Sequence, residues 1–335
     1  VSLGSSGLSL HDGDVPFRRA GNGTRRLLAV AIQRDLAKAG GLTLVDEVEH
    51  GLEPHRLRHL LRQLRDGLGG KKGHVVMTTH APVALAELKA DELRVVRSDT
   101  GQTAILSVGS DLQQILAKCS DAFLARKVLV CEGDTEVGLC RRLDRAWSAA
   151  GASFGLAGVA VTANGDGGRT VAPAAAKALA DLKYCVAYLG DSDQRMKPGR
   201  ASLQASGVSL LLWEEGVALE LRVARDLPWA GVRDLVRIAM DRRGERSIRD
   251  SIADALVVKP AALSLDPTEW ATQVNDEPAL REAIGAKAQE SSQGWFKGLE
   301  GGEQLGDVIL THWEGLAGKD LRVKLDELRV WAHGT

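Results

Sequence analysis

The sequence lacks any run of about 20 apolar residues, which is the length that a membrane-spanning helix requires. Its first seven residues, VSLGSSG, contain neither the basic region nor the apolar core of a signal peptide. They also lack an initiating Met, as expected for a fragment of a longer chain. We therefore expect no membrane partner and a cytoplasmic location.

Cysteine is scarce as well, and none of the four cysteines forms a CxxC pair or lies in a Cys/His cluster. This spacing argues against a zinc site and predicts buried, reduced thiols in a cytosolic protein. The four are Cys119, Cys131, Cys140 and Cys185.

No charge of one sign dominates, since 43 Lys and Arg residues stand against 44 Asp and Glu residues. The net charge of −1 argues against a protein that binds polyanions over its whole surface. It still allows a local basic groove beside an acidic cluster, because the two charges cancel in the sum. Hydrophobic residues at 44% and charged residues at 26% are typical of globular chains, and 335 residues suggest two or three domains.

Three elements in the first 85 residues carry a phosphate-binding pattern. A glycine turn opens an amphipathic helix predicted over residues 18–38, and the free N–H groups of a helix N-terminus favour phosphate. The turn consists of Gly21, Asn22, Gly23 and Thr24. An apolar strand over 42–45 ends in Asp46 and Glu47, which suit Mg²⁺ binding and the activation of a water. His80 follows a second strand over 75–79, where an imidazole can sense a terminal phosphate.

Together these elements resemble the C-terminal part of an ATP-binding cassette (ABC) ATPase. Residues 21–28 resemble the signature loop and helix, 42–47 the Walker B strand, 49–54 the D-loop and 77–82 the switch-histidine strand. The resemblance implies that ATP and Mg²⁺ are cofactors of the complete protein, bound through the glycine turn, the two acids and the histidine.

One element of that family is missing from the sequence. No G-x-x-x-x-G-K-[ST] phosphate loop (Walker A) is found. In this family the loop precedes the signature helix, so we expect it upstream of Val1. ATP hydrolysis is therefore not expected from this chain alone.

A second pattern places carboxylates after two apolar strands. Glu132 follows a strand over 127–131, and Glu136 lies one turn into the helix that comes next. Asp191 and Asp193 follow another strand over 185–189. Parallel strands end at one edge of a sheet, where four carboxylates repel one another unless a hard divalent cation binds them. For each element alone, a solvated turn or a helix N-terminal acid is the favoured interpretation; the pair favours a metal site.

This second pattern resembles a Toprim domain, in which Glu-Gly-x-Thr-Glu follows one strand and Asp-x-Asp another. A Toprim domain directly after an ABC head resembles the OLD (overcoming lysogenization defect) nucleases, over roughly residues 10–215. The resemblance implies two Mg²⁺ or Mn²⁺ ions held by four carboxylates. These are Glu132, Glu136, Asp191 and Asp193.

OLD nucleases also use a lysine late in the chain, and Lys297 in the segment QGWFKGL is the candidate. A cation there can stabilise charge on the scissile phosphate. A surface lysine beside two packed aromatic residues is an equal alternative. Glu220 is a weaker additional ligand candidate, since a solvated helix face explains it as well.

The predicted fold class is α/β. We expect the C-terminal part of an ABC ATPase head over residues 1–115, a Toprim domain with a parallel sheet over 120–216, and a helical insertion or appendage over 217–335 that completes the nuclease module. Arginines in this last part are expected on solvated helix faces, with Arg242, Arg243 and Arg246 as candidate phosphate contacts.

The expected function is a divalent-metal-dependent DNA endonuclease with a two-metal mechanism, coupled to an ABC-type ATPase and acting in phage defence or DNA processing. The expected partners are DNA, read with little sequence specificity, and a second copy of the chain. The only tyrosines, Tyr184 and Tyr188, lie in a predicted strand, so a topoisomerase nucleophile is disfavoured. The alternative is an ATP-dependent DNA-binding or bridging module whose Toprim domain is not catalytic.

Overall fold

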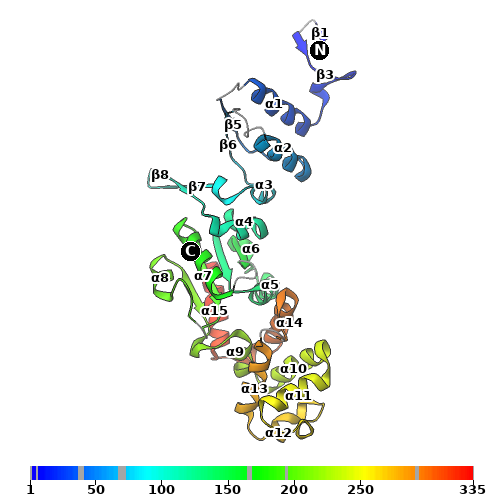
Figure 1. The fold of residues 1–335 in the computed structure, drawn as a ribbon, viewed down its shortest axis with the longest axis vertical. Coiled ribbons are helices and arrows are strands. Elements are labelled where there is room, and N and C mark those ends of the chain that lie inside the picture. Colours follow the sequence, from blue (N-terminus) through cyan, green and yellow to red (C-terminus); the bar gives the residue numbers. More distant parts are fainter. Residues whose placement is uncertain are drawn as a thin grey trace. The chain divides into compact units, whose positions relative to one another are not determined.

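The computed structural model describes residues 2–4, 7–36, 41–66, 73–163, 168–192, 195–290 and 294–334 (Figure 1). The chain divides into two compact units, Val1–Leu93 with Leu116–Leu124, and Arg94–Ile115 with Ala125–Thr335. The second unit joins most of the ranges 120–216 and 217–335 that the sequence predicted as separate parts, because their apolar side chains share one core. It also contains residues 94–115, which the sequence predicted as part of the ATPase head.

The first unit contains a pair of parallel strands with helices packed on one side. In β5 and β6 the register pairs Leu42 with His74 and Val45 with Met77. Residues pointing to one face, such as Val45, share a core with Leu57 of α2 and its neighbours. The strands are β1 (Ser2–Gly4), β2 (Gly7–Ser9), β3 (His11–Asp12), β4 (Val15–Pro16), β5 (Leu42–Val45) and β6 (His74–Met77), and the helices are α1 (Asn22–Leu36), α2 (Pro54–Asp66) and α3 (Pro82–Ala86).

The second unit is built on a four-stranded parallel sheet in the order β10-β9-β11-β12. The buried apolar residues of β9 and β11 read as near-continuous runs, as expected for strands covered on both faces. The strands of this unit are β7 (Arg94–Asp99), β8 (Gln102–Ser107), β9 (Lys127–Cys131), β10 (Val159–Ala163), β11 (Cys185–Gly190) and β12 (Ser209–Leu212).

Helices account for the remainder of this unit, with the C-terminal ones coloured yellow to red in Figure 1. The helices are α5 (Asp134–Ser148), α6 (Phe154–Ala157), α7 (Gly168–Asp181), α8 (Arg200–Ala205), α9 (Leu219–Asp226), α10 (Trp229–Arg243), α11 (Glu245–Ala255), α12 (Trp270–Val274), α13 (Glu277–Gln289), α14 (Gly298–Thr311) and α15 (Asp320–His333), while α4 (Gln113–Lys118) crosses the division between the units. Within the described residues, no helix is both long and apolar enough to cross a membrane.

Helices α5 and α14, far apart in sequence, pack tightly against each other (Figure 1). Glycines allow the close approach, since a Cβ on Gly302 would lie 2.0 Å from the Thr135 carbonyl oxygen and 2.8 Å from the Leu139 nitrogen. Arg145 adds a two-pronged ion pair to Glu303, with both N–O distances at 3.0 Å. The tail of the chain is thereby fixed to the first helix after β9.

Two expectations about side-chain environment need correction. Cys131 and Cys140 are buried as predicted, but Cys185 is exposed and Cys119 is only partly buried, because Cys185 starts β11 at the rim of the sheet. Arg222 is also buried rather than solvated, since α9 is covered by α13 and α15. It pairs there with Asp226 at 3.2 Å.

Candidate functional site

The centre of the parallel sheet places two of the predicted carboxylates at neighbouring strand ends. The chain leaves β9 toward β10 on one side, and β11 and β12 follow on the other side, so strand order reverses between β9 and β11. Ligands of open α/β sheets bind at the carboxyl ends of strands at such a switch point. Glu132 follows β9 there, and Asp191 follows β11.

Glu132 lies across the end of β11. Its Oε2 accepts hydrogen bonds from the Asp191 backbone N–H at 2.8 Å and from the Tyr188 hydroxyl at 3.2 Å. The carboxylate fits because residue 190 is glycine: a Cβ on Gly190 would lie 2.7 Å from Glu132 Oε2. The Glu132 side chain is therefore oriented by Tyr188, Gly190 and Asp191, in and directly after the neighbouring strand.

Glu136 is buried in the first turn of α5. Its Oε2 accepts a hydrogen bond from the Gly133 backbone N–H at 3.0 Å, which caps the helix N-terminus. Burial, followed by the neighbouring charges of Glu220 and Glu132, raises the pKa of this carboxyl from 4.5 to about 8. The capping role that the sequence allowed is thus present, in an environment that penalises the negative charge.

Asp191 connects the sheet to α9. Its Oδ1 accepts the backbone N–H of Leu219 at 2.9 Å, and this bond brings the next residue, Glu220, to the cluster. Burial and the charges of Glu136, Glu132 and Glu220 raise the pKa of Asp191 well above its usual value. Glu220 therefore lies close enough to Glu136 and Asp191 to raise their pKa values, a proximity that helical periodicity alone did not indicate.

Lys297 reaches the same cluster from the other end of the chain. Its Nζ lies 3.3 Å from Glu220 Oε1, and the lysine side chain is 49% exposed whereas that of Glu220 is 6% exposed. The backbone just before it is fixed to α5, because Thr135 Oγ1 donates to the Phe296 carbonyl oxygen at 3.2 Å. The structure thus pairs Lys297 with Glu220, while the buried Trp295 and Phe296 before it also agree with the alternative of a surface lysine beside two packed aromatic residues.

Four carboxylates, Glu132, Glu136, Asp191 and Glu220, consequently interact electrostatically, and Lys297 pairs with one of them, Glu220. Carboxylate oxygens are the ligands that hard divalent cations prefer, and such a cation would offset the repulsion that raises two of the pKa values. Within the part of the chain described here, no group of three or more His, Cys, Asp or Glu side chains is arranged to hold an ion as it stands. Asp193, the fourth predicted ligand, lies outside the described residues.

The hydrogen bonds within the cluster account for this arrangement. Glu136 is turned toward the Gly133 N–H, and Asp191 toward the Leu219 N–H. Each bond occupies one carboxylate oxygen and leaves the second oxygen of that group as a possible metal ligand. The chemistry of these oxygen donors suits a hard divalent cation.

The acids after β5 in the first unit form their own network. Thr78 Oγ1 donates to Asp46 Oδ1 at 2.5 Å and accepts the Glu47 backbone N–H at 2.8 Å. His80 Nε2 lies 3.0 Å from Glu47 Oε1, and this interaction raises the pKa of the histidine. The Walker B-like acids and the switch-like histidine predicted from sequence are thus in contact.

Glu49 is a residue of this network that sequence reasoning did not single out. Thr79 Oγ1 donates to Glu49 Oε2 at 2.7 Å, and the His80 backbone N–H donates to Glu49 Oε1 at 2.6 Å. Although burial opposes it, these two bonds lower the pKa of Glu49. The available signal was an acid two residues after Glu47, at the start of the D-loop-like segment 49–54.

The glycine turn lies against the D-loop-like segment. A Cβ on Gly23 would lie 2.4 Å from the Gly51 carbonyl oxygen, so the backbones nearly touch. Arg56 donates to Thr24 Oγ1 at 3.2 Å, and Arg26 reaches the Asp46 carbonyl oxygen. The residues Gly21 and Asn22 complete the turn, with α1 starting at Asn22. The turn and the acids of β5 are therefore adjacent parts of one unit.

Residues 8–86 match the protein family described as "AAA domain, putative AbiEii toxin, Type IV TA system". Among solved structures, one similar chain comes from work titled "Structural biochemistry of ATP-driven dimerization and DNA stimulated activation of SMC ATPases". That likeness has 16% sequence identity and a TM-score of 0.25, and it covers 29% of this chain and 58% of the other. No curated protein matches the chain.

The family match is confined to the first unit and reaches no residue of the acidic cluster. It agrees with the ABC-type motifs on the residues that form the network around Asp46, Glu47 and His80. The N-terminal segment of this chain is ATPase-like.

Proposed function

We propose that the second unit is a divalent-metal-dependent DNA endonuclease. The observation that carries this proposal is the meeting of carboxylates from β9, α5, β11 and α9 with Lys297 at the switch point of the sheet. Buried, mutually repelling carboxylates destabilise a protein, so their gathering at a ligand-binding edge favours a functional role.

Glu132, Glu136, Asp191 and Asp193 are the residues we assign as ligands of two Mg²⁺ or Mn²⁺ ions. Two such ions would activate a water and stabilise the leaving oxygen in phosphodiester hydrolysis. Glu220 either joins these ligands or serves as the anchor of Lys297, with which it is paired.

The chain's own residues supply orientation and positive charge. Tyr188 and the Asp191 backbone N–H hold Glu132 in place. Lys297, half exposed, is placed to attract a phosphate of the DNA backbone while Glu220 fixes its direction. Tyr188 does not serve as a nucleophile in this scheme, because it is fully buried and its pKa is raised by burial and by Glu132.

The ATPase-like unit is proposed to bind ATP with Mg²⁺ in the complete protein and to regulate cleavage. Asp46 would hold the ion, Glu47 would orient a water and His80 would contact the terminal phosphate. Dimerisation and a role in phage defence or DNA processing belong to the same proposal, since they follow from the OLD resemblance.

A nicking assay on supercoiled plasmid with Mn²⁺ tests the assignment. Asp191→Asn keeps the size of the side chain and should lower the cleavage rate by about 100-fold, since it removes one charged ligand. The matched control Asp181→Asn changes an exposed aspartate on α7 and should cleave like the unmodified protein.

Equal cleavage by the Asp191→Asn and unmodified proteins would contradict the proposal. The alternative of a non-catalytic Toprim domain predicts no metal-dependent cleavage by any of the three proteins, together with DNA binding that depends on ATP.

A further inference from the structure

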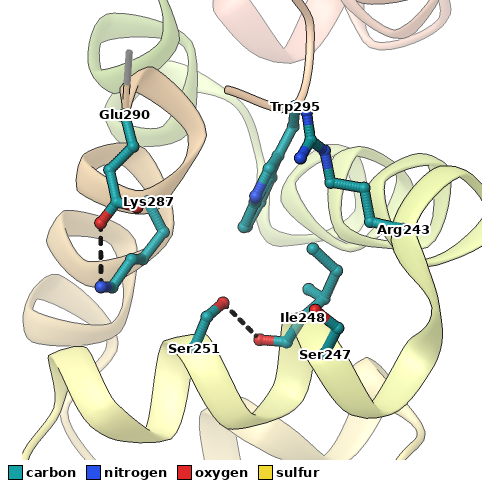
Figure 2. A pocket seen from close by; sticks show the side chains of 7 residues that line it. All are labelled: Arg243, Ser247, Ile248, Ser251, Lys287, Glu290 and Trp295. Atoms are coloured by element: carbon teal, nitrogen blue, oxygen red, sulfur yellow. Dashed lines mark hydrogen bonds and ion pairs between the residues drawn. The ribbon is translucent and has the colours of Figure 1, made fainter. Parts of the chain in front are cut away.

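A cavity separate from the acidic cluster is lined by residues of α10, α11 and α13 and by Glu290 and Trp295. It encloses about 380 Å³ and is lined by Arg243, Ser247, Ile248, Ser251, Lys287, Glu290 and Trp295. Lys287 and Glu290 lie on one side, Arg243 and Trp295 on the other, and the α11 residues lie beneath them (Figure 2). The volume falls within the range of small-molecule sites, roughly 300–1,000 Å³.

The polar groups of the cavity suit an anion with several oxygens. Ser247 and Ser251 lie one turn apart on α11, and the Ser251 hydroxyl donates to the Ile248 carbonyl oxygen at 2.9 Å, a bond with which a phosphate must compete. Arg243 and Lys287 contribute positive charge from two other elements. Guanidinium, ammonium and hydroxyl donors together are a common set for binding phosphate.

The positive charge remains available to a ligand. Lys287 pairs with Glu290 at 2.9 Å and with Asp254 at 3.6 Å, but both carboxylates are substantially exposed, and exposed pairs contribute little stability. Arg243 donates to the Gly294 carbonyl oxygen at 2.8 Å, which uses one of the five donors of a guanidinium. A phosphate can therefore compete for both cations.

The remaining wall is apolar and firmly held. Trp295 and Ile248 line the cavity and are only 3% and 2% exposed, so each offers a ligand a small part of its surface. Arg242 donates to the Trp295 carbonyl oxygen at 3.0 Å, and the Trp295 N–H donates to the Ala288 carbonyl oxygen at 3.1 Å. A nucleotide matches these two parts of the cavity, because it joins a flat base, which can lie against this wall, to an anionic phosphate, which can lie near the cations.

We propose that this cavity binds a nucleoside 5′-phosphate, with the phosphate between Arg243, Lys287 and the α11 hydroxyls and the base toward Trp295. The ligand is either a free mononucleotide or the terminal nucleotide of a DNA strand. The site lies outside the cluster assigned to metal and does not depend on cleavage by it.

Calorimetric titration of the full chain in EDTA tests the site, because chelation keeps metal-bridged phosphate out of the acidic cluster. The probes are dTMP, thymidine, inorganic phosphate, and one oligodeoxynucleotide with either a 5′-phosphate or a 5′-hydroxyl. We expect dTMP to bind about tenfold or more tightly than thymidine or phosphate, since only dTMP uses both walls. Preference for the 5′-phosphorylated strand over the 5′-hydroxyl strand identifies a strand end as the ligand, and binding of dTMP alone identifies a free nucleotide.

Two substitutions locate the binding. Ser251→Asp puts a carboxylate into the cavity and should weaken dTMP binding by about tenfold or more through charge repulsion. Ser251→Asn has nearly the same shape as Ser251→Asp without the charge, so it should weaken dTMP binding clearly less than Ser251→Asp does. Lys287→Met removes a cation from a different helix and should weaken binding in the same direction, which guards against misfolding of a single variant.

Three results would overturn the site: no heat of binding with dTMP, equal affinity for dTMP and inorganic phosphate, or unchanged affinity in both Ser251→Asp and Lys287→Met. Loss of dTMP binding with plasmid cleavage retained separates this site from the nuclease proposal. Retained dTMP binding without cleavage contradicts the nuclease proposal alone.

Discussion

At the scale of single residues, Gly190 leaves room for the carboxylate of Glu132, a role that its position in a buried strand does not indicate. It is the last residue of β11, and the space where its Cβ would lie is taken by the Tyr188 hydroxyl and the Glu132 carboxylate. A side chain there would push Glu132 off the end of the sheet. The residue type at 190 thus fixes the position of a carboxylate that belongs to another strand.

We predict that Gly190→Ala lowers the free energy of unfolding by about 2 kcal/mol, because the added Cβ overpacks the site. Urea unfolding measures this change, and metal-dependent cleavage should fall as well because Glu132 moves. Gly199→Ala is the control, since nothing lies within 4 Å of a Cβ at that position. If both variants unfold like the unmodified protein, the close packing around Glu132 is refuted.

The raised pKa of Glu136 predicts a pH-dependent stability in metal-free buffer. Between the usual carboxyl pKa of 4.5 and about 8, the folded state retains a proton that the unfolded chain releases. The free energy of unfolding should therefore fall as pH rises through this window, and the loss should be complete above it.

Glu136→Gln removes this titration, so its melting temperature should exceed that of the unmodified protein by an amount that grows from pH 5 to pH 8. Glu300→Gln alters a carboxylate that is 80% exposed and should leave the pH profile unchanged. Parallel profiles for Glu136→Gln and the unmodified protein would exclude a raised pKa at Glu136.

Sequence reasoning found most residues of the cluster but not their contacts. Glu132, Glu136 and Asp191 were predicted from their places after strands, where the structure has them. The pairing of Lys297 with Glu220 was undetermined, because 77 positions separate them and only the packing of α9 and α14 around α5 and the sheet joins them. Contacts between residues far apart in the sequence leave no local periodic pattern from which they could be predicted.

At the scale of elements, the contact between α5 and α14 determines where Lys297 lies. The lysine directly precedes α14, so any separation of the two helices moves its ammonium group away from the carboxylates. Glycines on both helices, Gly138 and Gly302, are what permit the approach.

Gly302→Ala should therefore destabilise the second unit by at least about 2 kcal/mol, since its Cβ would collide with backbone rather than with a movable side chain. Denaturant unfolding measures the loss. Leu299→Ala, at a partly exposed position of the same helix, should cost clearly less. The reverse order of the two losses would contradict this description of the interface.

The strands and helices themselves were largely predictable. The strands predicted over 42–45 and 127–131 agree with β5 and β9, and the strand predicted over 185–189 ends one residue later in β11. The helix predicted from residue 18 begins instead at Asn22 in α1. The order β10-β9-β11-β12 was not predictable, because period-two and apolar-run patterns identify strands without naming their neighbours. That order is what makes the β9 and β11 ends a switch point.

At the scale of the whole molecule, the two units differ in the size of their apolar cores, since the core of the second unit is much the larger. In the first unit Leu42, Leu44 and Val76 are each more than half exposed on the outer face of β5 and β6. In the second unit one large core unites the sheet with the C-terminal helices. A two-stranded sheet with an open apolar face is marginally stable, so the first unit should unfold more easily.

Differential scanning calorimetry should accordingly show two transitions, with the lower one belonging to the first unit. Mn²⁺ should raise only the upper transition, because a ligand stabilises the folded state that binds it. Asp191→Asn should abolish the Mn²⁺ shift while Asp181→Asn retains it. A shift of the lower transition alone would place the metal in the other unit.

Helix α15 is hydrogen-bonded to the first residue of β9. Lys127, at the start of β9, donates to the carbonyl oxygens of Trp331 and Ala332 at the end of α15, the latter 205 positions later. Positive charge at a helix C-terminus is favourable, so this contact secures the last helix to the sheet. Helix α15 in turn packs against β12.

Because the chain is synthesised from its N-terminus, the carboxylates of the cluster are made before Lys297. A growing chain that has emerged as far as α9 already carries Glu132, Glu136, Asp191 and Glu220, but neither Lys297 nor the helices that seat it. Ribosome-bound chains stopped before residue 297 should therefore show an exposed, protease-sensitive sheet. On the proposed function, a nascent polypeptide carries the acids of a nuclease without their lysine, and it becomes able to cut DNA only after Lys297 and α14 have been synthesised.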